Sequence, residues 1–158
     1  MDLYDFYATI VDGVAQDDDL VSWATAHFGK AIHVYGAMPS ADFPDMTDDV
    51  PFVLFGEPMR SCSQSQRRIT YACGAWMGLS DEDDMVLVPD NAQRPTGLEL
   101  ILDGMRLVRL AVVASLPDGV LLDDFEEHAD VNAVGSEVHG DLNFVFIHTL
   151  TIGQSPME

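Results

Sequence analysis

The stretch LNFVFIHTLTIG, residues 142–153, is the most strand-like part of this 158-residue chain. Chain ends fray unless they are tied down, and this segment is too apolar to be left in water. Its side chains alternate, so that one face carries Leu142, Phe144, Phe146, Leu150 and Ile152. A strand of about eleven residues spans roughly 36 Å, about twice the common length. We therefore expect residues 142–153 to lie in a sheet.

Three or four further strands are expected earlier in the chain. RITYACGAWMGL (68–79) alternates clearly, with Ile69, Tyr71, Cys73, Ala75 and Met77 on one face and Arg68, Thr70, Ala72, Gly74 and Trp76 on the other. PFVLFGE (51–57) contains an apolar run bounded by proline and glycine, which is typical of an interior strand. AIHVYGAMP (31–39) and MVLVPD (85–90) indicate shorter strands.

Three segments have the periodicity of helices. DLYDFYATIVDGVAQ (2–16) has an apolar stripe and begins at Asp2, a suitable cap. LVSWATAHFG (20–29) follows the capping oxygens of DDD (17–19) and ends at Gly29. PTGLELILDGMRLVRLAVVASLPDG (95–119) carries the capping-box pair Thr96 and Glu99. Its predicted buried face consists of Leu98, Leu102, Met105, Val108 and Val112.

The order of these segments predicts the fold class. Residues 118–141 are acidic and indicate a long irregular excursion, and loops of that length are usually functional or disordered. The remaining order is helix, short helix, three or four strands, long helix, loop and strand. This order predicts one α+β domain over residues 1–158, with an antiparallel or mixed sheet of about four or five strands and helices packed on one face.

The charge of the chain excludes several classes of partner. There are 27 Asp and Glu residues against 7 Lys and Arg, for a formal net charge of -20. Such a surface repels phosphate backbones and anionic lipid, so we expect neither direct nucleic-acid binding nor membrane binding. Three explanations of the acidity remain open. It serves solubility, it complements a basic partner surface, or it imitates nucleic acid. Because MDLYDF lacks the basic start of a signal peptide, a cytoplasmic site of assembly is expected.

The residues that catalysis or a metal would need do not form a recognisable motif. His128 and His139, with Glu126, Asp130 or Asp141, are the set that could gather around a divalent ion, but acidic segments contain such combinations by chance. His148 lies on an apolar strand face, which favours a packing role. We therefore expect a non-enzymatic protein with no catalytic residue, no cofactor and no metal.

Two small groups of residues remain. Cys62 and Cys73 are expected to be reduced thiols, although a disulfide is geometrically possible if they face each other across a hairpin. Arg67 and Arg68 are the only adjacent cations, and in so acidic a chain they suit carboxylates of a neighbouring strand or subunit. As subunit or partner interface we predict Arg67, Arg68 and the acidic loop residues Asp81, Asp83 and Asp84.

The same order of elements resembles the phage tail terminator and minor tail proteins. The likeness is carried by DFYATIVDGVAQDDDLVSWATAHFG (5–29), AIHVYGAMP (31–39), DVPFVLFGE (49–57), RITYACGAWMGL (68–79), LELILDGMRLVRLAVVASL (98–116) and the last strand closed by GQSPME (153–158). It spans almost the whole chain. The resemblance implies a homo-oligomeric ring, commonly hexameric, that caps the tail tube and presents a face to the head connector.

Three hypotheses about function follow. The leading one is a structural virion protein of a phage or prophage, which joins tail tube to neck as part of a ring and is assembled in the host bacterial cytoplasm. Its partners would be its own copies, the tail tube protein and a head-connector or neck protein. The alternative is an acidic interaction module, such as a nucleic-acid mimic that inhibits a DNA-binding protein. The third is a metal-dependent hydrolase that uses the late histidines.

Overall fold

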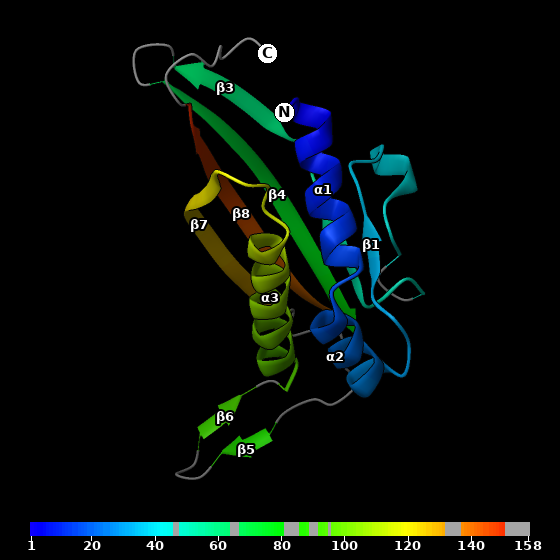
Figure 1. Cartoon of the computed structure of the whole chain (residues 1–158). Helices are drawn as coiled ribbons and strands as arrows, with labels where there is room; N and C mark the ends of the chain where they lie inside the picture. Colours follow the sequence, from blue (N-terminus) through cyan, green and yellow to red (C-terminus); the bar gives the residue numbers. More distant parts are fainter. Residues whose placement is uncertain are drawn as a thin grey trace.

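The helices and the sheet form two layers (Figure 1). The computed structural model describes residues 1–45, 48–63, 67–80, 86–88, 92–94, 96–131 and 137–150. Within these residues the chain forms three α-helices and a mixed six-stranded sheet, with the helices on one face of the sheet. The predicted α+β class is confirmed, and the sheet has six strands where the sequence indicates four or five.

The two N-terminal helices lie where the sequence predicts, except that the second begins at Asp18, two residues before Leu20. In α1 (Leu3–Ala15) the Asp2 side chain accepts a 2.8 Å hydrogen bond from the Asp5 backbone N–H. In α2 (Asp18–Phe28) the Asp17 side chain accepts one of 2.8 Å from the Leu20 N–H. Each of these bonds satisfies a backbone donor that the helix itself leaves without a partner. Gly29 ends α2 in the left-handed region, at φ 68°, where glycine carries no steric cost.

The long helix α3 (Thr96–Ala114) is confirmed, but its buried face is rotated relative to the prediction. The residues that face the sheet are Ile101, Met105, Val108, Ala111 and Val112. Leu102, predicted to be buried, is 45% exposed, so this part of the prediction is wrong. A Cβ atom at Gly140 would collide with the Met105 side chain. The helix therefore approaches the sheet closely at Met105, and Leu102 turns towards solvent.

The main sheet has the strand order β1-β2-β4-β8-β7, and β3 pairs with β4 beside β2. The strands are β1 (His33–Tyr35), β2 (Phe52–Phe55), β3 (Met59–Ser63), β4 (Arg68–Ser80), β7 (Val120–Val131) and β8 (Glu137–Thr149). The β1–β2 pair is parallel, and the other pairs between the described strands are antiparallel. β4 and β8 pair along their full 13 residues, which gives the sheet a long central ribbon.

β2 and β3 form one interrupted strand along the same edge of β4. Phe55 lies opposite Ala75 and Met59 opposite Ala72, so the outer strand contains one residue more than β4 over this interval. The Gly56 N–H still donates a 2.9 Å hydrogen bond to the Gly74 carbonyl. An extra residue of this kind interrupts the regular ladder, and here the interruption lies beside Gly74.

The C-terminal strand β8 is an interior strand. It pairs with β4 on one side and β7 on the other. The predicted inward residues Leu142, Phe144, Phe146 and Leu150 are all buried, while Ile152 lies outside the described residues. Phe6 of α1 packs against this strand, with its ring centroid 5.2 Å from that of Phe146. A terminal segment this apolar is thus held by two strands and by the first helix.

The prediction that residues 118–141 are irregular is wrong. Val120–Val131 forms β7, and β8 already begins at Glu137. The register shifts between Leu122 and Asp124, so a bulge turns both Leu122 and Phe125 towards the helices. Such a shift breaks the period of two along VLLDDFEEHADV, and the many carboxylates beyond it resemble a solvated loop. Among the described residues, nothing pairs with the outer edge of β7 or covers its outward carboxylates, which agrees with its acidic composition.

The remaining short elements agree in part with the sequence. β5 (Val86–Val88) confirms the strand predicted in MVLVPD, and it pairs with β6 (Ala92–Arg94), which the sequence does not indicate, in a separate two-stranded sheet. The strand predicted within residues 31–39 is β1, which is only three residues long. The loop after β1 contains a turn of 3-10 helix, η1 (Ser40–Asp42).

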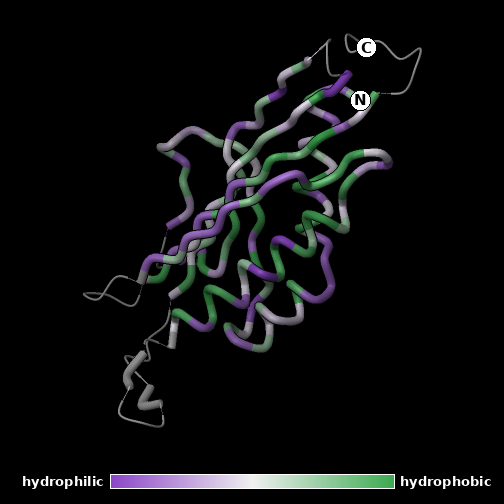
Figure 2. Tube along the Cα trace, turned by 90° about the vertical axis from the view of Figure 1, so that its left-hand side faces the viewer, coloured by the Kyte–Doolittle hydropathy of each residue, from purple (hydrophilic) through white to green (hydrophobic). Residues whose placement is uncertain are grey.

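Apolar side chains are buried on both faces of the sheet. The larger core lies between the sheet and the helices, and its largest fully buried side chains include Tyr71, Phe6, Phe55, Phe144 and Phe146. A smaller cluster of Val50, Phe52 and Leu54, packed against Tyr35, Met38 and Trp76, lies on the opposite face. Figure 2, turned by 90°, shows the helices gathered on one side of the sheet. Among the described residues the opposite face is covered beside β1 and β2, and these residues leave most of β4, β8 and β7 open there.

Candidate functional site

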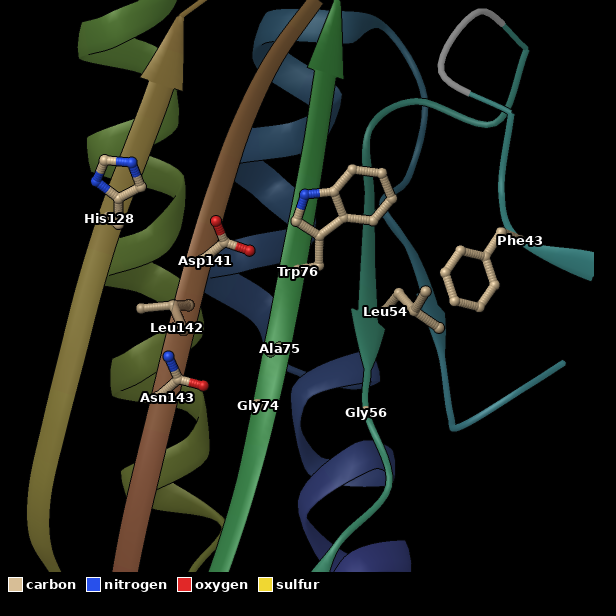
Figure 3. A pocket seen from close by; sticks show the side chains of 10 residues that line it. All are labelled: Phe43, Leu54, Gly56, Gly74, Ala75, Trp76, His128, Asp141, Leu142 and Asn143. Atoms are coloured by element: carbon tan, nitrogen blue, oxygen red, sulfur yellow. The ribbon is translucent and has the colours of Figure 1, made fainter. Parts of the chain in front are cut away.

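An open groove of about 660 Å³ lies on the sheet face opposite the helices (Figure 3). Its walls include Phe43, Leu54, Trp76, His128, Asp141 and Asn143, and Gly56 and Gly74 also border it. Phe43 belongs to the loop that follows β1, and the other residues come from β2, β4, β7 and β8 or their ends. The groove therefore depends on strands that are distant in sequence.

Strand register explains why these side chains meet. Asp141 of β8 is directly opposite Trp76 of β4 on one side and opposite His128 of β7 on the other. Directly opposed residues point to the same face of a sheet, so the three side chains form one row across the strands. In Figure 3 the Asp141 carboxylate lies between the indole and the imidazole. The next row contains Gly74 and Asn143.

Gly74 borders the groove and has no side chain to fill it. A Cβ atom there would lie 3.1 Å from the Asn143 Oδ1 atom and 3.6 Å from the Leu142 carbonyl oxygen. Any larger residue would therefore press on the Asn143 amide. The absence of a side chain leaves this amide oxygen beside open space, where it can accept a hydrogen bond.

Trp76 forms the rigid aromatic wall. Its ring stacks on that of His139, with centroids 5.3 Å apart and planes at 10°, and it meets the edge of Phe52 at 5.3 Å. The buried Nδ1 atom of His139 has no hydrogen-bond partner among the described residues. Contacts on two sides hold the indole in place, so the groove has a preformed wall beside a carboxylate.

The two histidines of the metal hypothesis, His128 and His139, lie on the open face. His128 is opposite Asp141, and His139 is opposite Asp130. In the part of the chain that the structure describes, however, no group of three His, Cys, Asp or Glu side chains is placed to hold a metal ion. A carboxylate, an amide and an aromatic ring instead suit the binding of a cationic side chain.

The predicted interface residues are placed only in part. Arg68 forms an ion pair with Asp123 of β7 at 3.5 Å, so it meets a carboxylate within its own chain. Arg67 is exposed at the turn before β4, at φ 49°, and its carbonyl accepts a 2.8 Å hydrogen bond from the Leu150 N–H. Asp81, Asp83 and Asp84 lie outside the described residues. Their role at an interface stays a prediction, as does that of the two arginines.

The two ends of the sheet differ in charge. The β3–β4 hairpin carries Arg60, Arg67 and Arg68, and Arg68 is already paired with Asp123 of β7, while β7 carries further exposed carboxylates on the far side of β8. Figure 2 looks onto the β7 side, where hydrophilic residues predominate along the strand. Such a separation of charge within one sheet favours contacts between unlike ends.

The two cysteines do not form a disulfide. Cys62 lies opposite Ile69 and Cys73 opposite Phe144, so the hairpin register does not bring their side chains together. Burial raises the pKa of the Cys73 thiol from its ordinary value of 9.0 to about 12. A thiol with this pKa is neutral at physiological pH and is a poor nucleophile.

Sequence reasoning did not identify the groove. It placed Gly74 and Trp76 on the less apolar face of their strand, and a tryptophan beside a glycine on such a face was the available signal. Phe43 and His128 join Trp76 only through long-range packing and strand order. The residues that line the groove with Trp76 could therefore not be predicted from the sequence alone.

Comparisons with known proteins do not place the chain in a family. No protein-family model matches it, and no curated protein matches it in sequence. Among the described residues, no helix has both the length and the apolar character needed to cross a bilayer.

Proposed function

We propose that this protein is a structural, non-enzymatic subunit of a phage or prophage virion, which forms a ring that caps the tail tube and joins it to the neck. The resemblance to tail terminator and minor tail proteins supports this role through the order of elements. The sheet with helices on a single face agrees with that order. The open face of the sheet is the observation that carries the proposal.

That open face presents apolar side chains in adjacent strands. Met59 of β3 is 67% exposed and Leu121 of β7 is 64% exposed. Between them, Ala72, Val145 and Ile147 occupy neighbouring positions of the same face. A run of apolar residues across four strands is unusual for a face that stays in water, and it suits a protein–protein contact.

Unlike charges at the two ends of the sheet favour head-to-tail contacts between copies. Among the described residues, β7 pairs only with β8, and the edge beyond it carries carboxylates. At the β3–β4 hairpin Arg68 is paired with Asp123 of its own β7, and Arg67 is the exposed arginine that remains for another copy. Contact between two different patches generates a ring if the rotation closes, and a ring leaves no sheet edge exposed to aggregation.

Sedimentation tests the ring directly. We expect a species several times the mass of the 17.3 kDa chain, either alone or after addition of tail tube protein. Leu121→Glu should reduce this species because it places a charge in the apolar row. The matched control Leu102→Glu, at a 45% exposed position of α3 on the helix side, should leave it unchanged. A monomer under both conditions would refute the ring.

The acidic-mimic alternative is favoured by one observation. Asp124, Glu126 and Asp130 point to the open face at alternate positions of β7. Alternate residues of a strand lie roughly 6.7 Å apart, whereas phosphates advance by roughly 3.4 Å per nucleotide along each DNA strand. His128 also interrupts the row, so the match to DNA is weaker than the case for assembly. Salt-sensitive capture of a DNA-binding protein, competed by DNA, would favour the mimic over the ring.

A further inference from the structure

The groove beside Trp76 has the chemistry of an arginine receptor. A guanidinium group stacks on an aromatic face and pairs with a carboxylate in a planar, two-pronged geometry. Trp76 supplies a fixed ring, Asp141 supplies the carboxylate in the same row, and Asn143 supplies an amide oxygen in the next row. Among the described lining residues there is no lysine or arginine to compete for Asp141, and His128 is the basic side chain opposite it. The groove is thus complementary to a positively charged side chain.

Arg67 has the properties of a side chain that could bind in this groove. It is exposed at the turn before β4, while the Leu150 hydrogen bond holds its backbone in place. Three other arginines have carboxylate partners within the chain: Arg68 with Asp123, Arg106 with Asp103 and Arg109 with Glu127. Arg67 has no ion pair among the described residues. Its charge is therefore available to another molecule.

Arg67 cannot reach the groove of its own chain. Arg68 and Trp76 are eight residues apart on β4, a distance of roughly 26 Å along an extended strand. The two features also lie towards opposite ends of the central ribbon. Within one copy they remain separate, but between two copies they can meet.

We propose that Arg67 of one copy enters the Trp76–Asp141 groove of the next copy and fixes the register of the ring. The inference rests on the ring proposed above and names the contact that would build it. The contact joins a hairpin turn to a groove, so it is head-to-tail, and each copy carries one of each. Such a contact propagates around a ring and is not satisfied in an isolated pair.

Charge reversal tests the contact from both sides. Arg67→Glu and Asp141→Arg should each weaken association by about tenfold or more, and the double variant should recover most of it. Arg106→Glu and Asp12→Arg make the same charge changes at exposed helical positions and should have no such effect. Circular dichroism and thermal unfolding would identify a variant whose fold, not its interface, has changed.

Mixing two neutralising variants gives a sharper outcome, because alanines cannot pair with each other as an introduced glutamate and arginine would. Arg67→Ala keeps an intact groove, and Asp141→Ala keeps Arg67 before β4. An equimolar mixture therefore contains one working contact per pair, and sedimentation should show dimers but no rings. Rings in the mixture, or rings that persist in both single variants, would overturn the contact and leave the proposed ring standing. A wild-type chain that stays monomeric with and without tube protein would overturn both.

Fluorescence adds a measurement at the groove itself. Trp23→Phe leaves Trp76 as the only tryptophan of the chain. If Arg67 covers the indole, the emission of Trp76 changes with protein concentration as copies assemble, and Arg67→Glu abolishes that change. An unchanged emission across assembly would contradict the contact, because another interface would leave Trp76 in its present environment.

Discussion

Replacing Phe6 by alanine should destabilise the protein severely, because Phe6 joins the first helix to the two longest strands. Its side chain is 0% exposed. Its ring stacks on Tyr71 of β4 at a centroid distance of 4.3 Å and meets Phe146 of β8 at 5.2 Å. The substitution removes both ring contacts and leaves a cavity between helix and sheet.

The expected loss can be estimated from these contacts. Truncating a buried phenylalanine to alanine costs roughly 3–5 kcal/mol in free energy of unfolding, as the sum of lost transfer energy and the cavity left behind. For a domain of this size, each kcal/mol lowers the melting temperature by roughly 2–4 °C, so the expected decrease is roughly 6–20 °C. Urea unfolding followed by circular dichroism measures the free energy, and calorimetry measures the melting temperature.

Tyr4→Ala is the matched control for this experiment. Tyr4 is an aromatic residue of the same helix, two positions away, but it is 77% exposed. Both substitutions raise helix propensity by a similar amount, so the difference between them reports burial alone. Equal stability of the two variants, within about 0.5 kcal/mol, would refute the packing of α1 against β4 and β8.

Two further predictions concern a helix cap and the buried thiol. Asp17→Ala should lower the free energy of unfolding by about 1 kcal/mol because it removes the hydrogen bond to the Leu20 N–H, and Asp19→Ala in the same turn should cost less. In native protein one of the two thiols, the exposed Cys62, should react with a thiol reagent at pH 8, and Cys73 should react only on unfolding. Since the pKa of Cys73 rises from 9.0 to about 12 on folding, its stabilising contribution is complete below pH 9 and is lost as pH rises towards 12. The loss is at most about 4 kcal/mol, and Cys73→Ala should reduce the alkaline loss measured by urea unfolding.

Local signals predicted the helices well because they act over a few residues. The Asp2 and Asp17 caps and the glycine at the end of α2 lie next to the segments that they limit. The alternation in β4 and β8 was equally clear because each strand has one buried face. The orientation of α3 was missed at Leu102, since close approach to Gly140 is a property of two segments and not of either sequence alone.

Strand β7 was missed for a different reason. Its bulge changes the period at the point where the carboxylates begin, and the outward residues of an edge strand have the composition of a loop. The groove was missed for the same reason. Trp76, Asp141 and His128 form a row because their strands have the order β4-β8-β7, and the sequence did not predict that order. Sequence alone indicated an acidic region with histidines and could not place it beside a tryptophan.

Salt has two opposite effects on assembly. It weakens the repulsion between the negatively charged chains, and it also weakens the attraction between an arginine and a carboxylate at the contact. At roughly 0.01 M salt the Debye length is about 30 Å, so chains with a formal charge of -20 repel each other across whole subunits. At roughly 0.15 M it falls to about 8 Å, and only charges at the contact itself remain effective. The apolar row between Met59 and Leu121 does not depend on screening in this way. Assembly should therefore strengthen from low to physiological salt, whereas a contact made by arginine alone would weaken over the same range.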